Sequence, residues 1–164
     1  MTDRCFTGHN RREVKNMTKG EKILLMIILG IIIRFTPALD IVHELMHYGF
    51  CNAEGIAVLD LRWSGLTYAR ANAIVIYGGY GGEFLLYSAL VVFMGNHKLL
   101  SAFFFGVLMV VIGVSYFSVD FNRYALDFYG DQSRVNTVKI IWACFTTPIF
   151  LILLSYKIKE LKLV

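Results

Sequence analysis

The sequence predicts an all-α polytopic membrane protein with about four membrane crossings and one short β-hairpin. Of its 164 residues, 57% are hydrophobic and only 17% are charged. That hydrophobic share exceeds the roughly 45–50% of soluble domains, and the excess lies in long blocks rather than scattered along the chain. An ordinary soluble domain is therefore excluded.

The apolar blocks follow one another as residues 23–35, 38–51, 71–95, 99–119 and 135–156. The last three reach or approach the ~20 residues that a helix needs to cross ~30 Å of hydrocarbon. The first two are shorter and are separated by Pro37. They form either one crossing kinked at the proline or a pair of half-buried helices. A kinked crossing is the simpler interpretation and brings the total to four.

Polar, basic segments flank the blocks. We expect residues 1–22 to form a basic amino-terminal arm, residues 23–156 a single membrane-embedded domain and residues 157–164 a short basic tail. Six basic residues precede Ile23 and favour a cytoplasmic amino terminus. If the first two blocks crossed separately, the basic residues of the other loops would lie inside instead, so the absolute orientation stays open.

The net charge of +4 does not indicate a nucleic-acid partner, because the basic residues gather at the ends of the apolar blocks. Contact with anionic lipid head groups explains them. We therefore expect a multi-pass integral protein whose partner is the lipid bilayer. We place it in the plasma membrane of a prokaryote, although nothing in the sequence separates that membrane from an organellar one.

The motif HELMH, at residues 43–47, is the strongest chemical signal. In a helix, His43 and His47 lie one turn apart on one face and can present imidazole nitrogens to one zinc ion. Glu44 flanks that face, where it can take a proton from a water molecule that the metal activates. Ionisable groups at membrane depth are costly and are usually functional, which favours a metal site over a chance match.

A catalytic zinc site usually has three protein ligands, so one more must come from elsewhere. The candidates beside apolar blocks are Glu83, Asp120, Asp127 and Asp131. Because the third and fourth blocks form an out-and-back pair, residues 118–134 return to the membrane face at which the HELMH helix ends. Glu83 follows the small residues YGGYGG midway along its block, so a hydrogen-bonded residue on a packing face explains it better than a ligand role.

Four segments, in order, resemble the small members of the site-2 protease family of intramembrane zinc metalloproteases. They are TPALDIVHELMH, GIAVLDLRWSGLTYARA, IVIYGGYGGEFLLYSALVV and YGDQSR, and they cover most of residues 36–155. The resemblance implies a zinc ion held by two histidines and a downstream aspartate. It also implies that the motif glutamate is the general base for hydrolysis of peptide bonds within or beside the membrane.

Carried over residue by residue, the resemblance makes His43 and His47 zinc ligands and Glu44 the catalytic base. For the aspartate we favour Asp131 in GDQSR, with Asp127 as the second choice. The larger family members carry an Asn-Pro segment ending in Leu-Asp-Gly, whereas this chain has LDFYGD. Asp120 is equally explained as a loop or helix-cap residue.

Residues 58–68 alternate between apolar and polar side chains on either side of Ser64-Gly65, which predicts two strands and a turn. Beside a protease site, such a hairpin could pair with an extended stretch of a membrane-spanning substrate. We therefore expect Leu61, Trp63 and Gly65 to contact the substrate. An interfacial hairpin that Trp63 anchors in the head groups is the alternative.

Two other functions fit the same residues. One is a membrane metal-binding or scaffold protein that does not cleave, although the presence of Glu44 argues for turnover. The other is a membrane zinc peptidase in which Glu83 is the third ligand. The natural substrate and the oligomeric state are not predicted.

Overall fold

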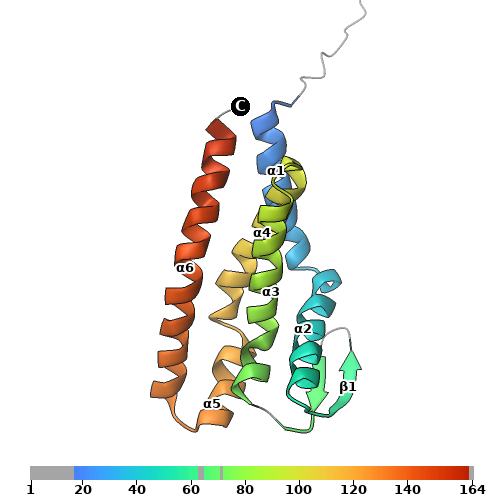
Figure 1. The fold of residues 1–164 in the computed structure, drawn as a ribbon, viewed down its shortest axis with the longest axis vertical. Helices are drawn as coiled ribbons and strands as arrows, with labels where there is room; N and C mark the ends of the chain where they lie inside the picture. Colours follow the sequence, from blue (N-terminus) through green and yellow to red (C-terminus); the bar gives the residue numbers. More distant parts are fainter. Residues whose placement is uncertain (1–16, 63–64, 71, 163–164) are drawn as a thin grey trace, which may run out of the picture.

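The computed structural model describes residues 17–62, 65–70 and 72–162, and within them the chain is a bundle of helices with one small hairpin (Figure 1). The helices and strands are α1 (Lys19–Arg34), η1 (Pro37–Leu39), α2 (Asp40–Ala53), β1 (Val58–Arg62), β2 (Gly65–Tyr68), α3 (Ala73–Phe93), α4 (Lys98–Ser115), η2 (Asp120–Tyr124), α5 (Ala125–Tyr129) and α6 (Gln132–Lys162). The chain runs down the bundle through α1 and α2, up α3, down α4 and up α6 (Figure 1).

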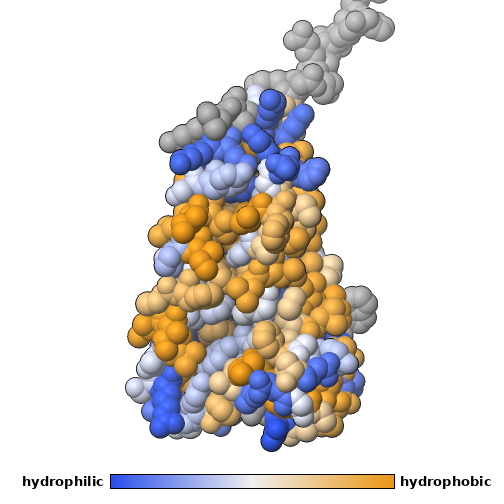
Figure 2. All heavy atoms as spheres, viewed as in Figure 1, coloured by the Kyte–Doolittle hydropathy of each residue, from blue (hydrophilic) through white to orange (hydrophobic). Residues whose placement is uncertain are grey.

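Three helical segments are long and apolar enough to cross a membrane: Ala73–Phe93, Lys98–Arg123 and Gln132–Leu161. They confirm the last three apolar blocks as helices. Figure 2 shows apolar side chains around the middle of the molecule and polar side chains at both of its ends. Because lipid replaces water around such a band, this distribution is compatible with a helical membrane protein.

The first apolar segment is broken at the predicted proline. α1 and the following helical segment, Pro37–Ala53, meet at 79° and together pass the length and composition test for a broken span or a re-entrant loop. Thr36 has extended backbone angles, φ −92° and ψ 152°. A residue before proline is driven out of the α-helical region by the proline ring, so the break occurs at this residue.

The helix ends differ from the predicted boundaries for local reasons. α1 begins at Lys19 because Thr18 and Glu21 form a reciprocal capping box. At the other end, α6 continues to Lys162, so residues 157–162 extend the last helix instead of forming a separate tail. Lys157 is buried and donates hydrogen bonds to Ser101 on α4 and to Glu160, which holds the last turns of α6 against the bundle.

α1 and α4 pack with their backbones almost touching. A Cβ atom at Gly30 would collide with the carbonyl oxygen of Phe103, and a Cβ atom at Gly106 would collide with the carbonyl oxygen of Ile27. Small residues permit this close approach, which is typical of helices that pack within membranes. The carboxyl end of α1 is thereby fixed inside the bundle.

The predicted hairpin is confirmed. β1 and β2 are antiparallel, with Leu61 opposite Leu66 and Val58 opposite Tyr68. Trp63 and Ser64, at the turn, lie outside the described residues. The hairpin packs on α2 through a small apolar cluster around Cys51, which is fully buried. It therefore lies beside the helix that carries HELMH (Figure 1).

Candidate metal centre

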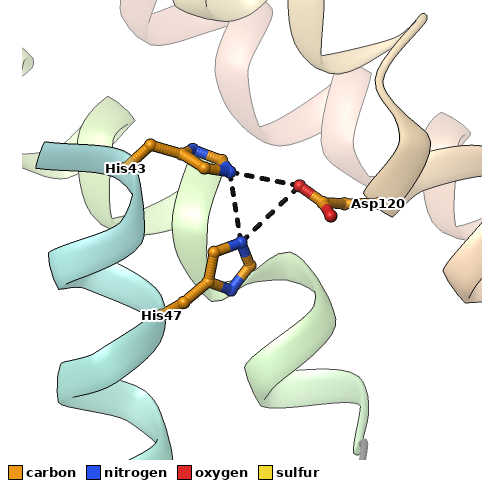
Figure 3. Close-up of side chains that lie close together, drawn as sticks. All are labelled: His43, His47 and Asp120. Atoms are coloured by element: carbon orange, nitrogen blue, oxygen red, sulfur yellow. Dashed lines mark hydrogen bonds and ion pairs between the residues drawn. The ribbon is translucent and has the colours of Figure 1, made fainter. Parts of the chain in front are cut away.

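The two motif histidines point the same way from α2, one turn apart (Figure 3). Their Nε2 atoms are 3.1 Å apart, and both side chains are nearly buried. The carboxylate Oδ2 of Asp120, from η2, lies 3.2 Å from Nε2 of His43 and 3.6 Å from Nε2 of His47. Three potential ligand atoms therefore face one another, and the group could hold a metal ion.

Asp120 lies where a third metal ligand would be, the position for which the sequence favoured Asp131 or Asp127. Asp131 is exposed and accepts a hydrogen bond from the backbone N–H of Ser133 at the start of α6. Asp127 is exposed on α5. Among the described residues, neither belongs to the group that could hold a metal ion, whereas Asp120 does.

The depth of the three aspartates in the bundle explains why Asp120 faces the two histidines and Asp127 and Asp131 do not. α2 begins at Asp40, so His43 and His47 are its fourth and eighth residues and lie in the middle of the helix, not near its carboxyl end. A matching ligand must come from the part of residues 118–134 that is deepest in the bundle. Asp120 begins η2, separated from the end of α4 by four residues, whereas α5 and the start of α6, which carry or adjoin the other two aspartates, lie further toward the end of the molecule (Figure 1).

On each histidine ring, the Nδ1 atom, which faces away from the group of three ligand atoms, has a hydrogen-bond partner of its own. Nδ1 of His47 lies 2.7 Å from the backbone carbonyl oxygen of Val75. Since that oxygen can only accept, His47 donates from Nδ1, which leaves Nε2 as the nitrogen that can bind a metal ion. Nδ1 of His43 similarly lies 3.1 Å from Oε2 of Glu83. Both rings are thus oriented so that their Nε2 atoms face each other and the carboxylate of Asp120.

This arrangement suits a cation. When both rings are neutral, two Nε2 lone pairs and one carboxylate oxygen face one another, which is a donor set that a metal cation stabilises. Zinc bonds of 2.0–2.1 Å in a tetrahedron place neighbouring ligand atoms about 3.3 Å apart. The observed separations of 3.1, 3.2 and 3.6 Å bracket that value.

A cavity of about 570 Å³ opens beside the three side chains. Glu44 lines it, as do Arg34 and Asp40 from the two sides of the helix break, and it is large enough for water and a peptide segment. Of the predicted substrate residues, Gly65 on β2 lines the cavity. Leu61 lies on β1, outside the cavity lining, and Trp63 is outside the described residues.

The glycine-rich part of α3 faces α2, as the sequence predicts for a packing face. A Cβ atom at Gly78 would collide with the ring of Phe50, and one at Gly82 would lie 2.7 Å from the sulfur of Met46. Sequence reasoning did not single out Gly79, which lies between these two glycines. A Cβ atom there would lie against both imidazoles, 2.7 Å from Nε2 of His43.

We expect Gly79→Ala to weaken metal binding, because the added methyl group must displace one imidazole or the other. Forcing a methyl group into a packed site typically costs about 1–3 kcal/mol. Gly81→Ala is the matched control on the same helix, since a Cβ atom there meets no atom within 4 Å. Zinc titration and thermal unfolding of both variants check this, and equal zinc affinity for the two would contradict it.

Glu83 has the role of a hydrogen-bonded residue that the sequence favoured. It is fully buried on α3 and binds Nδ1 of His43, the ring nitrogen that faces away from Asp120. Comparisons with protein-family models, curated proteins and solved structures give no match. The resemblance to site-2 proteases therefore stays a prediction from the sequence motifs.

Proposed function

We propose that this protein is an intramembrane zinc metalloprotease that hydrolyses peptide bonds of membrane-spanning substrates. The observation that carries the proposal is the convergence of His43, His47 and Asp120 on one point beside a cavity that Glu44 lines. The order of the sequence motifs supports the same reaction. The apolar band supports placing it in the membrane, with the broken α1–α2 segment counted as the first of four crossings.

Each residue has a defined task in this reaction. His43, His47 and Asp120 would hold zinc, which supplies Lewis-acid polarisation of water and of the scissile carbonyl. Glu44 accepts the proton of the attacking water on its carboxylate and returns it to the nitrogen of the leaving amine. Glu83 and the carbonyl of Val75 hold the two imidazoles at the angle that presents Nε2.

The hairpin offers a way to present the substrate. Gly65, Leu66 and Tyr68 of β2 line the cavity next to Glu44. An extended peptide that pairs with this strand would have its backbone bonds beside the metal centre, whereas a helical peptide keeps them paired internally. We therefore retain Gly65 as a substrate contact and propose β2 as the docking strand.

Metal removal tests the proposal. We expect the purified full-length chain to bind one zinc ion and to cleave a membrane-spanning test substrate. A strong chelator should abolish cleavage, and added Zn²⁺, but not Mg²⁺, should restore it, because imidazole ligands suit zinc and magnesium prefers oxygen. Unchanged cleavage after complete zinc removal would refute the mechanism, and zinc binding without cleavage of any tested substrate would favour the scaffold function.

The peptidase with Glu83 as third ligand is less well supported. Oε2 of Glu83 is hydrogen-bonded to Nδ1 of His43, while Nε2 of the same ring faces Asp120. A ligand role for Glu83 would require the His43 ring to turn over. The chelation experiment with Glu83→Gln separates the two, because Glu83→Gln keeps an oxygen that can accept from Nδ1 and should retain zinc.

A further inference from the structure

Arg34 is a buried charge that the proposed reaction does not use. It is the last residue of α1 and only 8% exposed. Its guanidinium donates to Oδ1 of Asp40 at 3.2 Å and to Oε2 of Glu83 at 3.1 Å. A charged group at membrane depth is costly unless it is paired, and such groups commonly mark functional sites.

The oxygen of Glu83 that receives Arg34 is the one that receives His43. Nη2 of Arg34 and Nδ1 of His43 each lie 3.1 Å from Oε2 of Glu83. Glu83 is completely buried, and its other oxygen has no hydrogen-bond partner among the described residues. The carboxylate is therefore held by these two donors, and its position depends on both of them.

Arg34 also spans the break in the first apolar segment. Asp40, its second partner, is the first residue of α2 and lies three residues before His43. One guanidinium thus connects the end of α1, the start of α2 and the middle of α3. The fork of an arginine suits this task because its nitrogens can reach two carboxylates at fixed angles, which a lysine ammonium cannot do.

The two histidines differ in how they are held. His47 donates to the backbone carbonyl of Val75, whose position is set by α3 itself. His43 instead donates to a side chain whose place is set by another side chain. A change at Arg34 should therefore disturb one metal ligand and leave the other in place.

We propose that Arg34 is a positioning residue of the metal centre, acting through Glu83 to hold the imidazole of His43. This inference rests on the metal centre proposed above. It assigns a function to the break between α1 and α2, because the break brings the end of α1 against Glu83 and so makes α1 part of the metal site.

The test uses the full-length chain in detergent micelles, stripped of metal and titrated with zinc in competition with a chromophoric chelator. We expect Arg34→Gln to bind zinc about 10–100-fold more weakly, the usual effect of losing a partner that orients a ligand. Arg34→Lys keeps the charge but not the fork, so it should fold and bind zinc with a smaller loss. Arg134→Gln, at an exposed arginine on α6, is the control and should match the wild type.

Cobalt substitution adds a readout that a purely structural role would not move. The visible spectrum of the Co²⁺ form reports ligand geometry, and we expect it to shift in both Arg34 variants but not in the control. Wild-type zinc affinity and an unchanged cobalt spectrum in Arg34→Lys would overturn the inference while leaving the metal centre intact. If Arg34→Gln does not fold, Arg34→Lys decides. A wild-type chain that binds no zinc would overturn the metal centre and this inference together.

Discussion

Glu44→Gln should bind zinc as the wild type does and lose cleavage by about 10²–10⁴-fold, the usual contribution of a general base. The amide has nearly the same shape as the carboxylate but cannot take a proton from water. The three ligand atoms come from other residues, so the metal should remain. Zinc content and initial rates on a membrane-spanning test substrate, measured on the same preparation, check both halves of this result.

Glu54→Gln is the matched control for Glu44→Gln. Glu54 caps the carboxyl end of the same helix, and its carboxylate accepts a hydrogen bond from Asn72 at the surface. We expect this variant to cleave at the wild-type rate. Full cleavage by Glu44→Gln would refute its role as base, and loss of zinc from Glu44→Gln would show that the residue is needed to build the site.

Asp120→Asn should lose both zinc and cleavage. The substitution removes the only anionic ligand of the three, and a neutral amide oxygen is a poor ligand for zinc beside two imidazoles. Loss of an orienting partner alone costs about 10–100-fold in metal affinity, so loss of a ligand should exceed 100-fold. Zinc affinity by chelator competition is the measurement, with thermal unfolding of the metal-free form to verify the fold.

Asp131→Asn and Asp127→Asn test the two aspartates that the sequence motifs favoured as the third zinc ligand. Both aspartates are exposed and lie outside the group that could hold a metal ion, so both variants should retain zinc. Asp131→Asn keeps a side-chain oxygen that can accept from Ser133, so its helix start should also survive. Zinc loss in Asp131→Asn with retention in Asp120→Asn would restore the original choice of ligand.

Structural features that are determined by residues close together in the sequence could be predicted from the sequence alone. The apolar blocks predict α3, α4 and α6, because lipid demands long apolar helices and little else produces them. Pro37 marks the break because its ring acts on the residue directly before it. HELMH places two imidazoles on one face because helical spacing is set locally.

Features that depend on depth and on neighbouring helices could not be predicted in the same way. Choosing among three aspartates required knowing that α2 begins at Asp40 and that η2 follows α4 inside the bundle. Gly79 matters only because two rings from another helix lie over it. The one available signal for Asp120 was its position next to the end of an apolar block, which places it deepest of the three.

The break between α1 and α2 has a consequence for hydration. An uninterrupted helix satisfies its own main-chain N–H and C=O groups, whereas a break at membrane depth leaves some of them to other partners. Such irregular backbone is tolerated where it is buried in protein or borders a water-filled space. Phe35 and Asp40, on the two sides of the break, line the same cavity as Glu44. We expect water in this cavity to solvate the interrupted backbone, and in the proposed reaction the same water would supply the nucleophile.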